Sequence, residues 1–157
     1  MRKIVAWTLL ALTIFWCFFI WHFSLADASA SDVSSGRVTE TLNTALENLH
    51  TEFRVGQHFV RKAAHFCEFF ALGILLSATL VAFRVKYAFY LSLPILFAVA
   101  AIDECLQLFS PGRAAALSDV LLDTSGGICG ILLVFGAAIW CRWREENEKS
   151  EKPEKNT

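Results

Sequence analysis

An otherwise apolar segment begins with Arg61-Lys62-Ala63-Ala64-His65-Phe66-Cys67-Glu68 and runs on to Phe83. It is long enough to cross a bilayer as an α-helix, which takes about 20 residues. An ionised side chain in hydrocarbon is costly, so such residues normally face a cavity or one another. Arg61, His65 and Glu68 stand at i, i+4 and i+7 and therefore share one helix face. We expect this face to border a polar site.

The whole chain is rich in apolar residues. Of its 157 residues, 55% are hydrophobic and 18% charged, against about 45–50% and about 25% in soluble domains. The excess falls into four blocks of spanning length, at about 4–25, 63–83, 87–108 and 117–140. The net charge of −1 provides no basic field for nucleic acid. The five cysteines lack zinc or disulfide spacings, and we expect small packing residues, with Cys67 and Cys105 the one pair at similar depth.

We predict an all-α membrane protein with four transmembrane helices plus an amphipathic outer-face helix. Residues 1–25 form the first span, a signal-anchor, although Ala28-Ser29-Ala30 also fits a signal-peptide cleavage site. Residues 26–60 form an outer segment, a loop over 29–36 and then a helix from Val38, with a stripe through Leu42 and Leu46, to Gly56. Residues 61–140 form a core of three spans, and 141–157 a mobile cytoplasmic tail.

The basic residues predict the orientation. Nine fall on one side of a four-span chain: Arg2, Lys3, Arg84, Lys86, Arg142, Arg144, Lys149, Lys152 and Lys155. Five fall on the other side: Arg37, Arg54, Arg61, Lys62 and Arg113. Because positive residues concentrate on the cytoplasmic side, we predict a multi-pass protein of the cell membrane with both termini in the cytoplasm.

Two more spans carry ionisable residues near the same outer boundary. The third span ends with Asp103-Glu104 and Gln107, and the fourth begins with Asp119 and Asp123 after a Pro111-Gly112-Arg113 turn. We expect the three polar faces to meet in one pocket, with Gly126-x-x-x-Gly130 letting the fourth span pack closely against the second or third. Contact between two copies through Gly126 and Gly130 is the alternative use of this motif.

The charges in this pocket do not balance. Arg61, Lys62 and Arg113 face five acids, so a surplus carboxylate takes up a proton or binds a cation. We assign acid/base or hydrogen-bonding roles to Glu68, His65, Asp103 and Glu104. Binding roles go to a second set: Arg61, Lys62, Gln107, Arg113, Asp119 and Asp123. No zinc-type motif is present, so no metal or other cofactor is assigned, with a divalent cation as the alternative.

These motifs resemble the VanZ-like family, small bacterial membrane proteins named after the teicoplanin-resistance protein VanZ. The resemblance covers about 21–140 and rests on four motifs in order: Arg61 to Phe69 followed by Leu72-Gly73, then Asp103-Glu104 with Gln107, Pro111-Gly112-Arg113, and Asp119-Val120 with Asp123-Thr124 and Gly126. Phe69 stands where the family usually has tyrosine. The resemblance implies reduced susceptibility to teicoplanin-type antibiotics in some members and no known reaction.

We therefore expect a pocket that opens to the outer face and binds or acts on a cell-envelope component, a membrane lipid or a cell-wall-related small molecule. Arg61 and Arg113 would bind its anionic part. One alternative is a non-catalytic accessory protein that alters antibiotic access to cell-wall precursors. Another is a purely structural role, in which the buried charges only assemble the helices. An ion-coupled transporter is disfavoured because the inner halves of the spans lack ionisable residues.

Overall fold

The computed structural model describes residues 2–25, 28–49, 51, 53–110 and 116–150, and within them the regular elements are five α-helices. They are α1 (Arg2–Ser24), α2 (Ala28–Asn48), α3 (Gln57–Ala82), α4 (Ala88–Gln107) and α5 (Leu117–Ser150). Four of them, α1, α3, α4 and α5, are long and apolar enough to cross a membrane. The predicted all-α fold with four candidate spans is confirmed.

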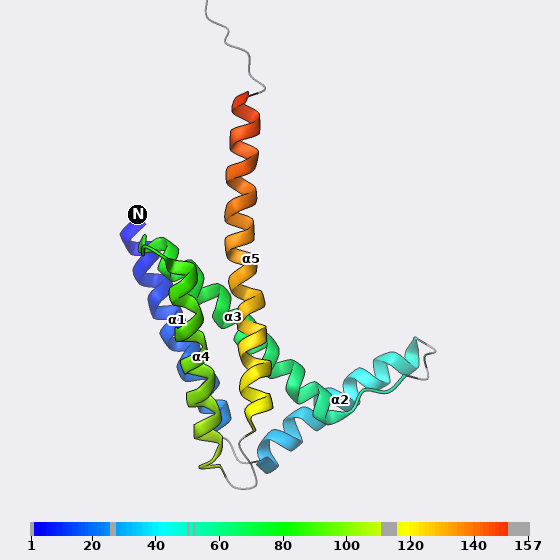
Figure 1. Cartoon of the computed structure of the whole chain (residues 1–157). Helices are drawn as coiled ribbons and strands as arrows, with labels where there is room; N and C mark the ends of the chain where they lie inside the picture. The colour runs from blue at the N-terminus through cyan, green and yellow to red at the C-terminus, as the bar shows by residue number, and fades with distance from the viewer. Residues whose placement is uncertain (1, 26–27, 50, 52, 111–115, 151–157) are drawn as a thin grey trace, which may run out of the picture.

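The bundle is assembled around α3, which contacts each of the other four helices. Figure 1 shows α1 and α4 side by side, α3 crossing them obliquely, and α5 entering the bundle with its first half and projecting beyond it with its second. At one end of the bundle α1 and α4 finish, α3 and α5 start, and α2 lies close by. We call this the α2 end. α1 starts and α5 ends toward the opposite end (Figure 1).

The core lies where α3 meets its neighbours. Its buried apolar side chains come from all four candidate spans: Ile20, Phe69, Leu72, Leu76, Leu96, Val99, Ala100, Val120 and Ile131. On α3, Phe69, Leu72 and Leu76 recur at i, i+3 and i+7 and so form one apolar stripe. Many other large apolar side chains, such as Trp7 and Phe15, are exposed on the outside of the bundle, which suits helices surrounded by lipid.

Glycines bring α3 and α5 into backbone contact. A Cβ atom on Gly126 would lie 2.4 Å from the Phe66 carbonyl oxygen, and one on Gly130 would lie 2.2 Å from that of Phe70. The sequence predicts that these two glycines pack the fourth span against the second or third, and the structure has them against the second. A contact between two copies through the same glycines would require α3 to leave this face of α5.

The outer segment differs from its prediction. Residues 29–36 belong to α2 and are not a loop, and α2 ends at Asn48 and not at Gly56. Gly56 instead has extended backbone (φ −82°, ψ 145°) and is the N-cap of α3. A hydrogen bond from Gln57 Nε2 to Ser35 Oγ at 3.0 Å favours a helix over residues 29–36. Because the two residues are far apart in sequence, no local pattern predicts this contact.

The last helix is also longer than predicted. The sequence places the end of the fourth span near Trp140 with a mobile tail after it, whereas α5 continues to Ser150. Six of residues 141–150 are Arg, Glu or Lys, which are good helix formers. Arg144 also pairs with Glu148 at 3.5 Å in the i, i+4 arrangement that favours a solvated helix. Residues 151–157 lie outside the described part of the chain.

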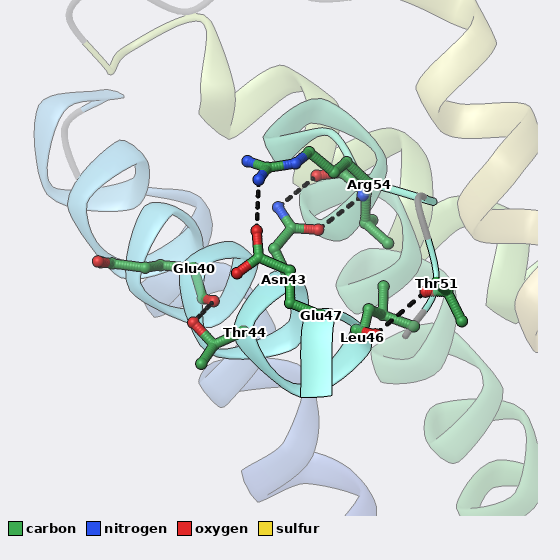
Figure 2. Close-up of polar contacts among 8 residues, drawn as sticks. Glu40, Asn43, Thr44, Leu46, Glu47, Thr51 and Arg54 are labelled. Atoms are coloured by element: carbon green, nitrogen blue, oxygen red, sulfur yellow. Dashed lines mark hydrogen bonds and ion pairs between the residues drawn. The ribbon is translucent and has the colours of Figure 1, made fainter. Parts of the chain in front are cut away.

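The connection after α2 folds back onto that helix, as Figure 2 shows. Asn43 Nδ2 donates to the Val55 carbonyl oxygen at 3.1 Å, and the Val55 N–H donates to Asn43 Oδ1 at 2.8 Å. Arg54 forms an ion pair with Glu47 beside these two hydrogen bonds. These contacts set the position at which α3 begins.

Replacing Asn43 by alanine is expected to release this connection. Both backbone groups of Val55 would lose their partners, at a cost of about 1 kcal/mol per hydrogen bond. Hydrogen exchange of the full chain in detergent should show faster exchange at the Val55 amide. Thr44→Ala is the matched control, because the Thr44 hydroxyl bonds only within α2, to the Glu40 carbonyl oxygen. Equal exchange in the two variants would contradict the assignment.

Candidate functional site

Three candidate spans each place one ionisable side chain at a common point. His65 of α3, Asp103 of α4 and Asp123 of α5 each offer a nitrogen or oxygen atom, and these three atoms lie within 4.8 Å of one another. Asp103 and Asp123 are 0% and 1% exposed, and His65 is partly buried. The predicted meeting of three polar helix faces is confirmed. We call these residues the three-helix cluster.

Glu68 lies at the edge of the three-helix cluster. Its Oε2 atom is 3.8 Å from Nδ1 of His65, one helical turn earlier on α3. The indole Nε1 of Trp16 donates to the Glu68 carbonyl oxygen at 2.9 Å, which anchors α1 against this turn. The position of Glu68 is therefore fixed from two sides, by its own helix and by α1.

Near the end of α4, Glu104 and Gln107 are also buried, and they have different partners. Gln107 Nε2 donates to Asp103 Oδ2 at 3.2 Å and so orients that carboxylate. Glu104 Oε1 accepts a hydrogen bond from the backbone N–H of Ala116, immediately before α5. Glu104 thus fastens the start of α5 to the end of α4. The sequence predicts an acid/base or hydrogen-bonding role for Glu104, with helix assembly as the alternative, but it does not identify Ala116 as the partner.

Lys62 and Asp119 form an ion pair at the rim of the site. Lys62 Nζ lies 2.9 Å from Asp119 Oδ1, and each side chain is about a third exposed. Ser118 Oγ also lies 3.3 Å from that carboxylate oxygen. A pair this accessible contributes little to stability. Both residues are candidates for binding in the sequence, and the structure places them against each other.

Asp123 stands out among the buried acids. Both of its carboxylate oxygens are buried, and neither has a hydrogen-bond partner or ion pair among the described residues. Buried polar groups are nearly always hydrogen-bonded, because burial without a partner costs several kcal/mol. A carboxylate in this position binds a proton or a cation.

A cleft adjoins this site on the α2 side. It lies between α2 and α3, has a volume of about 650 Å³, and is lined by Val33, Ser35, Gln57, His58 and Arg61. Arg61 precedes His65 by one turn of α3, so the polar face continues from the cleft toward the three-helix cluster. The sequence does not identify Ser35, Gln57 and His58 as site residues. They belong to no motif, and they come together only because α2 packs beside α3. Arg113 lies outside the described residues.

A family model described as VanZ/LLP1 matches residues 9–140. The chain belongs to the VanZ/LLP1 family. The match runs from within α1 to within α5 and so includes every candidate span and the three-helix cluster. This VanZ/LLP1 chain is a multi-pass membrane protein, and the resemblance found in the sequence is confirmed. No curated protein and no solved structure matches the chain.

Four of the five cysteines of this VanZ/LLP1 protein are not the packing residues expected, whereas Cys17 does pack against the core. All five are free, and Cys67, Cys105, Cys129 and Cys141 are exposed. Cys67 and Cys105 each follow a cluster residue, His65 and Asp103, by two positions. Two positions turn a helix by about 200°, so these cysteines face away from the cluster, and no Cys67–Cys105 disulfide forms.

Proposed function

We propose that this VanZ/LLP1 protein binds the polar headgroup of a cell-envelope molecule at the α2 end of its bundle, and that this end faces the outside of the cell. One observation carries the proposal: an imidazole and two buried carboxylates from three apolar helices lie within 4.8 Å of one another. Charged groups within membrane spans are expensive and mark functional sites by default.

The orientation is supported by the basic residues at the opposite end. Arg2 and Lys3 of α1 and Arg84 after α3 line one cleft of about 520 Å³ there. Arg142 and Arg144 belong to the second half of α5, the half that projects beyond the bundle (Figure 1). Such a concentration of positive charge favours the cytoplasmic side, which puts both termini in the cytoplasm and the α2 end outside.

The chemistry of the cleft favours an anionic headgroup. Arg61 brings a guanidinium, whose forked donors match phosphate and carboxylate oxygens. Gln57 and His58 add further polar groups. A headgroup held there would reach toward Glu68, His65 and Asp103, which would act on it as acid, base or hydrogen-bonding groups. If the bound molecule is a cell-wall precursor, the same binding would alter access of a teicoplanin-type glycopeptide to its target.

Replacing Arg61 by alanine is expected to weaken binding of anionic headgroups by about tenfold or more, as the loss of a charge-assisted contact of about 1.5–3 kcal/mol implies. The measurement is a titration of the full chain in detergent with phosphatidylglycerol, with phosphatidylcholine as the neutral comparison. Arg54→Ala is the matched control, because Arg54 is exposed and paired with Glu47. Equal affinity of wild type and Arg61→Ala would refute the proposed headgroup site.

A purely structural role is the rival function, favoured by the contacts of Lys62 with Asp119 and of Glu104 with Ala116, which do join helices. Asp103→Asn separates the two accounts. The side chain keeps its shape and an oxygen for Gln107 but loses its charge. If the cluster serves a function, cells carrying this variant should match a deletion strain in envelope-lipid composition and teicoplanin susceptibility. A phenotype like that of the parent strain would support the structural role.

A further inference from the structure

The three-helix cluster has the ligand set of a metal centre. His65, Asp103 and Asp123 come from three different helices, and their ligand atoms already lie within 4.8 Å of one another. Protein nitrogen and oxygen ligands bind Zn²⁺ at about 2.0–2.2 Å in tetrahedral geometry, so two ligands of one ion lie about 3.3–3.6 Å apart. Small side-chain rotations would close the remaining gap, while the helix backbones stay in place.

The charge on this cluster requires a counter-charge. Asp123 is buried and has no hydrogen-bond donor or ion pair among the described residues, and the Asp103 carboxylate is buried in the same space. The nearest lysine along α3, Lys62, is already paired with Asp119. A buried carboxylate without a counter-charge, such as that of Asp123, is strongly unfavourable. A divalent ion would bind the carboxylates of Asp103 and Asp123 together and give Asp123 the partner it lacks.

We propose that His65, Asp103 and Asp123 bind one divalent transition-metal ion, Zn²⁺ or Mn²⁺. An imidazole ligand favours these ions over Ca²⁺ and Mg²⁺, which prefer oxygen ligands alone. Glu68 lies beside the imidazole, where a carboxylate commonly orients a metal-binding histidine. Three protein ligands leave at least one coordination position open, and that position would accept an anionic oxygen of the headgroup proposed above.

This site shares its pocket with the proposed function but does not depend on the identity of the headgroup, so it is tested without lipid ligand. The full chain, without a histidine tag, is freed of metal with a chelator in detergent and titrated with Zn²⁺ and with Mn²⁺. The wild type is expected to bind about one equivalent of at least one of them. Asp123→Asn, Asp103→Asn and His65→Ala should each weaken this binding by about 100-fold or more, since even loss of an outer-shell partner costs 10–100-fold.

Glu40→Gln is the matched control, because Glu40 is an exposed carboxylate of α2 outside the three-helix cluster. It should bind the metal as the wild type does. Thermal unfolding gives a second readout: metal should raise the Tm of the wild type and of Glu40→Gln by several degrees and leave that of Asp123→Asn unchanged. Without metal, Asp123→Asn should be at least as stable as the wild type, because it removes one of two crowded charges.

Two results would overturn the metal site. One is a wild type that binds neither ion at micromolar concentration, which would leave a shared proton as the counter-charge. The other is undiminished binding in all three ligand variants. Arg61→Ala keeps the two proposals separate: it should lower headgroup binding and leave metal affinity unchanged. Metal binding without headgroup binding would retain the metal centre and refute the proposed function, and the reverse would refute only the metal centre.

Discussion

Replacing Gly130 by alanine is expected to lower the free energy of unfolding by about 1–3 kcal/mol, the usual cost of forcing extra atoms into a packed interior. The new methyl group would lie 2.2 Å from the Phe70 carbonyl oxygen and 3.0 Å from the Ile74 backbone nitrogen. Both atoms belong to the α3 backbone, so neither can move without shifting a helix. The measurement is thermal unfolding of the full chain in detergent, followed by circular dichroism.

Gly136→Ala is the control on the same helix. A Cβ atom on Gly136 would meet nothing within 4 Å, and alanine is favoured over glycine in a helix by about 1 kcal/mol. The two changes are chemically identical and should shift Tm in opposite directions. A Gly130→Ala protein as stable as the wild type would show that α3 and α5 do not approach at this position.

Replacing Glu104 by alanine is expected to destabilise the start of α5 by about 1–3 kcal/mol, the cost of leaving a buried hydrogen-bonding group without its partner. The Glu104 carboxylate accepts the Ala116 N–H, and Glu104 is 4% exposed, so little water is available to replace it. Its negative charge also lies at a helix N-terminus, where it is favourable. Hydrogen exchange should show faster opening of the first turn of α5.

Glu104→Gln tests whether the bond or the charge matters. The amide oxygen of glutamine can still accept from Ala116, so most of the stability should return. A glutamine variant that is as unstable as the alanine variant would assign the effect to charge. Full stability of both variants would mean that Glu104 does not hold α5, and its buried carboxylate would then need another explanation.

The spans and the meeting of their polar faces could be predicted because both depend on local patterns. Apolar length identifies four helices, and the i, i+4 spacings of Arg61 with His65 and of Asp119 with Asp123 place those side chains on single faces. Gly126 and Gly130 predict close packing because only small residues allow it. The second and fourth of four consecutive spans cross in the same direction, so the polar starts of α3 and α5 lie at the same end.

What could not be predicted depends on partners distant in sequence. Gln57 forms a hydrogen bond with Ser35, and Asn43 forms one with Val55. These two contacts help to set the residues at which α2 and α3 begin and end. Lys62 forms an ion pair with Asp119. The sequence alone cannot select this partner from the five acids expected near the site. Glu104 and Asp103 are neighbours in sequence, yet one holds α5 and the other enters the cluster, because consecutive residues on a helix point about 100° apart.

Thiol cross-linking tests the central claim that charged residues of separate spans meet. In a chain otherwise free of cysteine, His65→Cys and Asp103→Cys are combined and treated in native membranes with copper phenanthroline or a short bifunctional thiol reagent. The comparison is a chain that keeps only Cys67 and Cys105, which lie on the same helices at similar depth but are exposed. The first pair should cross-link efficiently and the second should not. Equal cross-linking of the two pairs, or none at positions 65 and 103, would contradict the three-helix cluster.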